Sequence, residues 1–282
     1  MVRVSYCSGD SFSGNITQQW GPNGEDVKIS GSANAEAVLE WTRAQSPALR
    51  TLVIAGSSAG SIALQGWANR VIDRLQKKNH TRVVVHADSF AGLLFPVGQV
   101  NLVTFALYRA WGSCSSIALP SELKVACETG RLTIDEVFRS AMRAHPHAHF
   151  SMINSKVDTE QMRYSSVLAG REVMPTEFYK ETTLLLKAFV QEPNFRSYLV
   201  DGEFHTFLRR QELFIATPLG AAGGGNGTVL SKWLGGFATC QWHMPVPENT
   251  CEGRQVNVTE AGDPESPADY CDPALVGQGA AR

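Results

Sequence analysis

A serine between two glycines is the feature of this sequence best suited to covalent chemistry. Residues 56–60 read GSSAG and match the pattern G-x-S-x-G, with Ser58 at its centre. The apolar run at 51–55 precedes the pattern, and apolar residues recur at helical spacing from 62 to 75. A strand, a sharp turn and a helix in this order form a nucleophile elbow, in which flanking glycines avoid clashes with the neighbouring strand and helix. The pattern therefore predicts Ser58 as a nucleophile.

Such a serine needs a base and an acid, and two later segments supply them in the expected order. The run 149–158 predicts a strand with Asp158 beyond its carboxyl end. A second β-rich run, 198–200, is followed by a turn and His205. Carboxyl ends of parallel strands share one edge of the sheet, so both residues are expected near Ser58. The alternative is that Asp158 caps the following segment and His205 is a surface turn residue.

Four ordered blocks of the sequence resemble one known family. Residues 6–14 read YCSGDSFSG, the elbow follows at 56–60, ADSF stands at 87–90, and NSKVDTEQ at 154–161. In order and spacing these blocks resemble the pectin acetylesterase and Notum family of secreted carboxylesterases. The resemblance extends over residues 2–161, is thinner around His205 and ends near residue 222. It implies a catalytic triad of Ser58, Asp158 and His205.

The chain departs from the family pattern in two places. Ser61 replaces the last glycine of the family's G-x-S-A-G-G elbow. Family members also carry a G-G-W segment upstream of the Y-C-x-x-D block, where its amides supply part of the oxyanion hole, whereas Met1 lies five residues before Tyr6. The amide of Ala59 remains as one oxyanion donor. We therefore expect an N-terminally truncated member of the family.

Further residues are assigned from their places in these blocks. Asp10 is expected to shape the rim of the substrate site, and Ser89 and Phe90 to take part in substrate binding. Asp88 is expected to form a structural hydrogen bond near the elbow, because the family takes the later aspartate as its acid. Phe90, with the apolar residues at 93–95, lines either an acyl pocket or ordinary core.

The histidines at 145, 147 and 149 alternate along the chain and would suit a metal, but no acidic or thiolate residue lies near them in sequence. The six cysteines lack zinc-ligand spacing. An esterase of this type needs neither a metal nor an organic cofactor. We therefore expect none.

The elements that position these residues alternate between strands and helices. Strands are predicted at 2–7, 51–55, 82–86, 149–154 and 197–200, and helices at 33–44, 61–76, 132–143 and 176–191. Continuous apolar character at 51–55 predicts a strand buried on both faces. The alternation predicts the α/β class, with an α/β-hydrolase-like parallel sheet flanked by helices and its first strands missing.

Composition sets the domain plan and excludes some partners. The chain has 282 residues and can bury a large core, so residues 1–244 are predicted as one catalytic domain and 245–282 as a partly disordered segment rich in proline and glycine. A formal net charge of −2 gives no basic surface for nucleic acid. No apolar run is long enough to span a membrane.

Secretion is predicted from several features together. Glycosylation sequons begin at Asn15, Asn79, Asn226 and Asn257, and the cysteine count is even. Disulfides are the better interpretation of the cysteines, with Cys114 and Cys127 a plausible pair. The predicted location is extracellular or in a cell wall.

The predicted function is a carboxylic ester hydrolase that removes O-acyl groups, chiefly acetyl, from a polysaccharide such as pectin. The resemblance implies this substrate because the plant branch deacetylates pectin. It also leaves two alternatives. One is a lipid deacylase of the Notum branch, which removes a fatty acyl group from Wnt proteins, and the other is a catalytically silent relative that binds glycans.

Overall fold

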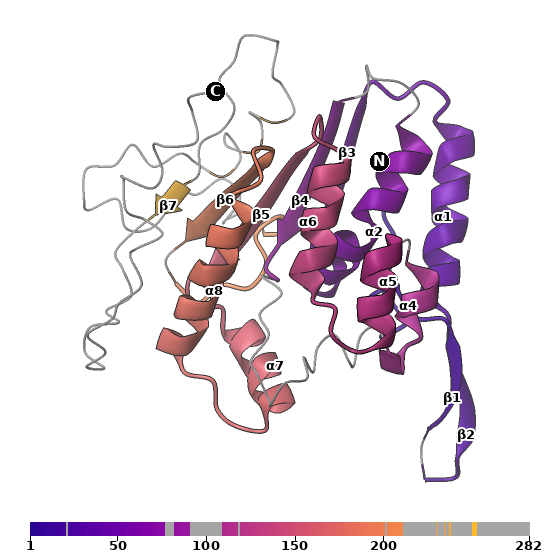
Figure 1. Ribbon diagram of the computed structural model, residues 1–282, viewed down its shortest axis with the longest axis horizontal. Coiled ribbons are helices and arrows are strands. Elements are labelled where there is room, and N and C mark those ends of the chain that lie inside the picture. Colours follow the sequence, from indigo (N-terminus) through magenta and orange to yellow (C-terminus); the bar gives the residue numbers. More distant parts are fainter. Residues whose placement is uncertain are drawn as a thin grey trace.

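The structure is a computed structural model that describes residues 1–20, 22–76, 82–90, 109–117, 119–200, 202–210, 230, 234, 237 and 250–252. Its central feature is a parallel sheet with the strand order β3-β4-β5-β6-β7 (Figure 1). The strands are β3 (Thr51–Ser57), β4 (Arg82–Asp88), β5 (His149–Ser155), β6 (Phe195–Val200) and β7 (Thr250–Glu252). Thr51 pairs with Arg82, Val84 with His149 and Phe150 with Phe195. The predicted parallel α/β sheet is confirmed.

Helix α1 (Gly31–Gln45) precedes β3 in the sequence, and the other described helices lie between the strands of the sheet. These others are α2 (Ala59–Leu75), α4 (Ser113–Ser116), α5 (Ser121–Glu128), α6 (Ile134–Ala144), α7 (Thr159–Ala169) and α8 (Pro175–Phe189). Local signals set several of their ends. Thr133 and Glu136 form a reciprocal capping box at the start of α6, Pro175 occupies the first turn of α8, and Gly170 ends α7 in the left-handed conformation.

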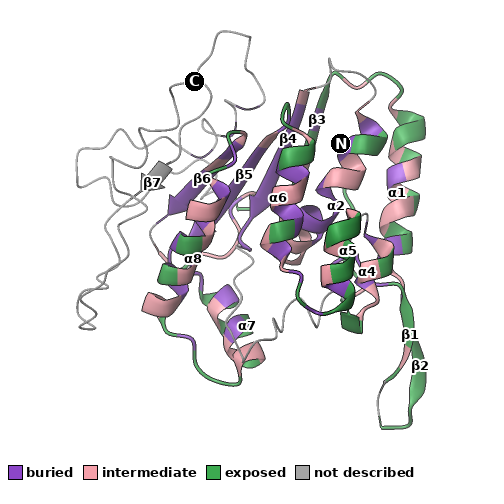
Figure 2. Ribbon diagram, in the orientation of Figure 1, coloured by how far each residue is buried: buried purple, intermediate pink, exposed green. Residues whose placement is uncertain are grey.

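One face of the sheet carries the main hydrophobic core. Helices α2, α6 and α8 pack against it and bury aromatic and aliphatic side chains such as Phe138, Phe150 and Phe195. In Figure 2 the buried residues accordingly follow the sheet and the inner sides of these helices. On the opposite face, Ile153 and Tyr198 pack with Phe207 and Phe237 in a smaller cluster.

Strand β3 differs from its prediction. It pairs only with β4 within the described part of the chain, and Val53 on its second face is 51% exposed. The apolar run therefore belongs to an edge strand that is covered on one face, whereas burial on both faces was predicted. Continuous apolar character does not distinguish these cases, since coverage depends on what packs above the strand.

The strand predicted at 2–7 is also absent. These residues are exposed and form no ladder with any other described segment. A β-rich pattern becomes a strand only where another strand satisfies its backbone groups. The domain boundary predicted at residue 244 and the segment 253–282 lie outside the described residues, so the domain plan stays a prediction.

A hairpin of β1 (Ile16–Trp20) and β2 (Glu25–Ile29) was not predicted. Its strands are antiparallel, with Ile16 opposite Ile29, and it projects from the rest of the molecule in Figure 1. The Asn23-Gly24 pair in the turn is the signal that was overlooked, and Gly24 has φ +64°. The hairpin starts directly after Asn15, which is exposed and is the asparagine of the first sequon.

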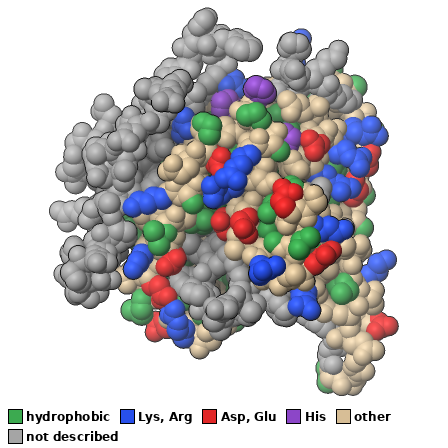
Figure 3. Space-filling model, viewed as in Figure 1, with side chains coloured by type: hydrophobic (Ala, Val, Ile, Leu, Met, Phe, Trp, Pro, Cys, Tyr) green, Lys and Arg blue, Asp and Glu red, His purple; other side chains and the backbone are tan. Residues whose placement is uncertain are grey.

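The described surface carries charges of both signs. On the face shown in Figure 3 basic and acidic side chains are interspersed. Some charged side chains form ion pairs between helices, as Arg70 of α2 does with Glu36 of α1. Within the described ranges, no helix has the length and apolar character needed to cross a membrane.

Candidate active site

Ser58 occupies the turn between β3 and α2 in an unusual backbone conformation. Its φ of +57° and ψ of −122° are rarely adopted by residues other than glycine, which indicates local strain. The amide of Ser58 donates to the carbonyl oxygen of Asp88 at 2.9 Å. Its own carbonyl accepts the amides of Ser61 and Ile62 and starts the helix. The strand, turn and helix of a nucleophile elbow are therefore present.

The two flanking glycines have different roles. A Cβ atom at Gly56 would overlap the carbonyl oxygen of Gly60, so this turn requires glycine at position 56. A Cβ atom at Gly60 would meet nothing within 4 Å. The predicted clash thus applies to the first glycine and not to the second.

Ala59 is the first residue of α2. Its amide lies in the first turn, where backbone N–H groups have no helical carbonyl to donate to. The positive end of the helix dipole favours a negative charge at this place. The geometry fits the oxyanion role predicted for Ala59, which stays a prediction.

Asp158 and His205 are in direct contact. Nδ1 of His205 lies 2.9 Å from Oδ2 and 3.0 Å from Oδ1 of Asp158. The Asp158 side chain is fully buried, and that of His205 is 19% exposed. Asp158 also caps α7, because Oδ1 accepts the amide of Gln161 at 2.9 Å. The carboxylate therefore caps α7 and also contacts His205, and its role as a catalytic acid stays a prediction.

Gln161 supports this pair and was not predicted to do so. Its Nε2 donates to Oδ2 of Asp158 at 2.8 Å and to Oδ1 of Asn154 at 2.6 Å. These bonds fix the orientation of the carboxylate that faces His205. The available signal was the spacing D-x-x-Q, which resembles the spacing of a capping box.

Asp88 forms the hydrogen bond near the elbow that was predicted. Its Oδ2 accepts the hydroxyl of Ser57 at 2.7 Å. The same carboxylate also accepts the amides of Phe207 and Leu208, just beyond His205, at 3.0 Å. The second set of contacts was not foreseen.

The residues predicted at the substrate site have internal contacts in the structure. Asp10 is fully buried, and its carboxylate accepts amides of Phe12, Gly14 and Gly31 at 2.8–3.1 Å. It thereby ties the loop at residues 8–14 to the start of α1. A substrate-binding role for Asp10 stays a prediction.

Ser89 and Phe90 are buried as well. The Ser89 hydroxyl donates to Oδ1 of Asp88 at 2.9 Å and accepts the amide of Thr206 at 2.8 Å. The carbonyl of Phe90 accepts Nε2 of Gln65 at 3.1 Å. Their predicted part in substrate binding is untested, and residues 93–95 lie outside the described part of the chain.

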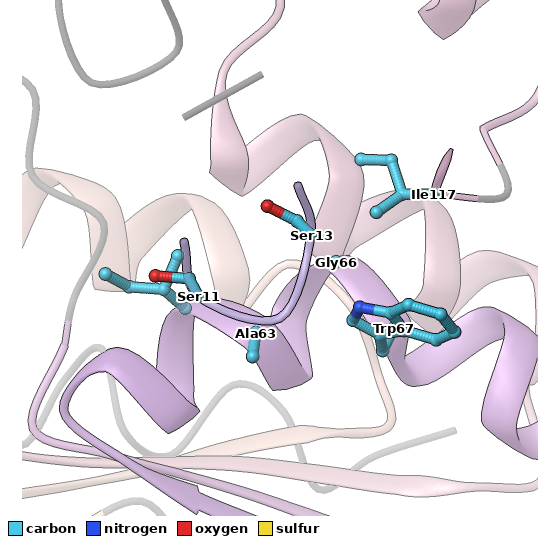
Figure 4. A pocket seen from close by; sticks show the side chains of 7 residues that line it. Ser11, Ser13, Ala63, Gly66, Trp67 and Ile117 are labelled. Atoms are coloured by element: carbon cyan, nitrogen blue, oxygen red, sulfur yellow. The ribbon is translucent and has the colours of Figure 1, made fainter. Parts of the chain in front are cut away.

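A small hollow lies elsewhere on α2. Ser11, Ser13, Ile117 and the α2 residues around Trp67 line it, as the close-up in Figure 4 shows. Neither Ser58 nor His205 is among the lining residues. The hollow is thus separate from the elbow and the Asp158–His205 pair.

The alternating histidines have unrelated partners. Nε2 of His145 lies 2.7 Å from Oδ1 of Asn69, while the ring of His149 contacts that of Phe237. Burial lowers the pKa of both histidines from its ordinary value. Among the described residues, no three His, Cys, Asp or Glu side chains gather as metal ligands would.

Comparison with known proteins adds a family and a fold. Residues 1–185 match the model of the family described as Pectinacetylesterase. The solved structures that resemble this fold include two crystal forms of the Wnt deacylase Notum from Drosophila. Form II has a TM-score of 0.55 and 18% identity over 88% of this chain and 70% of its own. Form I has a TM-score of 0.49 and 19% identity over 76% of this chain.

This chain spans 61% of the length of the form I protein. No curated protein sequence matches it. At these identities the form II structure supports the α/β-hydrolase-like fold alone.

Proposed function

The chain belongs to the pectinacetylesterase family, and on that basis we propose that it hydrolyses carboxylic esters through Ser58, His205 and Asp158. The observation that carries the proposal is the contact between Nδ1 of His205 and the buried carboxylate of Asp158. A carboxylate at Nδ1 holds the ring in the tautomer whose Nε2 accepts a proton. The strained elbow supports Ser58 as the nucleophile.

In the proposed reaction, Oγ of Ser58 attacks the carbonyl carbon of the ester while Nε2 of His205 takes the hydroxyl proton. The amide of Ala59 donates to the oxygen that becomes negative. The bond to the alcohol then breaks, His205 returns the proton to the alcohol, and the acyl group remains on Ser58. A water molecule attacks the acyl-enzyme with His205 as base, which releases the carboxylic acid and restores the serine.

The proposed substrates are O-acetyl esters of a polysaccharide such as pectin. The family description supports this substrate class. The proposed location is extracellular, supported by the Cys114–Cys127 disulfide, because such bonds persist in oxidising compartments. An exposed sequon at Asn15 agrees with a secreted glycoprotein.

The nucleophile is tested with a serine-directed fluorophosphonate and a short acyl ester. We expect the probe to label Ser58, and Ser58→Ala to abolish both labelling and turnover. Ser121→Ala is the matched control, because Ser121 is an exposed serine at the start of α5. Equal turnover by the Ser58→Ala variant and the unaltered chain would refute the mechanism.

Acyl length tests the substrate class. Acetyl esters should be cleaved faster than octanoyl esters in a shallow site, whereas a deep lipid pocket reverses the order through about 0.8 kcal/mol per buried methylene. A preference for octanoyl would indicate a lipid deacylase, and pectin binding without turnover a silent relative.

A further inference from the structure

Asp88 is a buried carboxylate that receives hydrogen bonds from two separate parts of the chain. It is the last residue of β4 and is fully buried. Its donors are the hydroxyls of Ser57 and Ser89 and the amides of Phe207 and Leu208, at 2.7–3.0 Å. Charge-assisted bonds of this kind are stronger than neutral ones.

The first part of the chain that bonds to Asp88 is the elbow. Ser57 directly precedes Ser58 and donates its hydroxyl to Oδ2 of Asp88. The backbone carbonyl of Asp88 accepts the amide of Ser58 itself. The strained residue at the elbow is therefore bonded to the end of β4 by its own amide and by its neighbour's side chain.

The second part of the chain that bonds to the Asp88 carboxylate is the loop that carries His205. Residues 202–204 are hydrogen-bonded to the segment that leads to Asp158. The carbonyl of Phe204 accepts the hydroxyl of Ser155 at 2.6 Å, and the carbonyl of Gly202 accepts the amide of Val157. Residues 206–208 are held by Asp88 and Ser89. His205 thus lies between two anchored stretches.

The backbone at this junction is strained on both sides. Ser89 has φ +55° and Thr206 has φ +66°, and the amide of Thr206 donates to the Ser89 hydroxyl at 2.8 Å. Non-glycine residues keep such angles only where surrounding contacts enforce them. We propose that Asp88 is a positioning residue that holds the His205 loop in register with the Ser58 elbow. This inference rests on the proposed function.

The test replaces the carboxylate by an amide of the same shape. Asp88→Asn removes the negative charge and turns one of the two acceptor oxygens into an N–H donor, so the bonds that the Phe207 and Leu208 amides donate to this side chain are weakened. Asp26→Asn is the matched control, because Asp26 is an exposed aspartate in the projecting hairpin. The first readout is independent of activity: the Nδ1–H resonance of His205 in protein labelled with ¹⁵N-histidine, assigned by its loss in Asp158→Asn.

We expect Asp88→Asn to shift or broaden this resonance and Asp26→Asn to leave it unchanged. On a short acyl ester, kcat should fall on the order of a hundredfold with little change in KM, because the base is displaced while substrate contacts remain. An unchanged resonance and unchanged kcat in a folded Asp88→Asn protein would overturn the inference. If the unaltered chain cleaves no ester, the resonance still decides the role of Asp88 while the proposed function fails.

Two milder variants serve if Asp88→Asn does not fold. Ser89→Ala removes the acceptor of the Thr206 amide, on the His205 side. Ser57→Ala removes a donor on the elbow side. Ser89→Ala should shift the His205 resonance and Ser57→Ala should not. If both variants leave the resonance unchanged, the inference is wrong.

Discussion

At the scale of single residues, the two glycines that flank Ser58 differ in how closely other backbone atoms approach them. A Cβ atom at position 56 would overlap the carbonyl oxygen of Gly60. A Cβ atom at position 60, which lies in the first turn of α2, would point into open space. One G-x-S-x-G pattern therefore contains a glycine that packing requires and one that packing does not require.

Replacing each of the two glycines by alanine tests whether packing requires it. Gly56→Ala should lower the free energy of unfolding by about 1–3 kcal/mol, because the backbone must shift to admit the methyl group. Gly60→Ala should leave it unchanged or raise it by up to about 1 kcal/mol, since alanine favours the helix. Urea unfolding of both variants gives the comparison, and equal effects would contradict this account of the turn.

At the scale of elements, the Cys114–Cys127 disulfide joins α4 to α5, and this pairing was predicted from the sequence. The bond closes a loop with a sequence separation of 13 residues. Cross-links of this length restrict the unfolded chain and typically stabilise the native state by about 3 kcal/mol.

Replacing both cysteines by serine should therefore lower the free energy of unfolding by about 2–4 kcal/mol. Cys7→Ser is the control, because Cys7 is exposed, forms no disulfide within the described part of the chain and should tolerate the change. Urea unfolding with and without a reductant measures both. A reductant that destabilises the double variant as much as the unaltered chain would count against a role for this bond.

At the scale of the whole molecule, His86 makes the stability depend on pH. It lies in β4, where Nδ1 is 2.5 Å from the Ser151 hydroxyl on β5 and the ring packs edge-on against Phe237. Burial lowers the pKa of His86 to about 4. An unfolded histidine has its ordinary value near 6.5, so the unfolded chain binds more protons between these two values.

The stability linked to His86 is thus complete above about pH 6.5 and is lost as the pH falls towards 4. Lowering the pH from 7.5 to 4.5 should cost about 2–3 kcal/mol through this residue. Urea unfolding of His86→Gln should show a correspondingly smaller loss than the unaltered chain over the same pH range. If His86→Gln and the unaltered chain lose the same stability, the pH dependence of unfolding arises from another residue.

The sequence alone predicted the parallel α/β sheet and the elbow, and it indicated Cys114 and Cys127 as a plausible pair. It also pointed to Asp158 and His205, whose side chains the structure brings into contact. Periodicity and the order of motifs are local properties, and carboxyl ends of parallel strands necessarily share an edge. Only the folded structure shows that β3 pairs on one side alone among the described residues, and that Asp88 contacts the loop beyond His205. Such contacts join residues more than a hundred positions apart, and no local pattern records which backbone amides fold back onto a buried carboxylate.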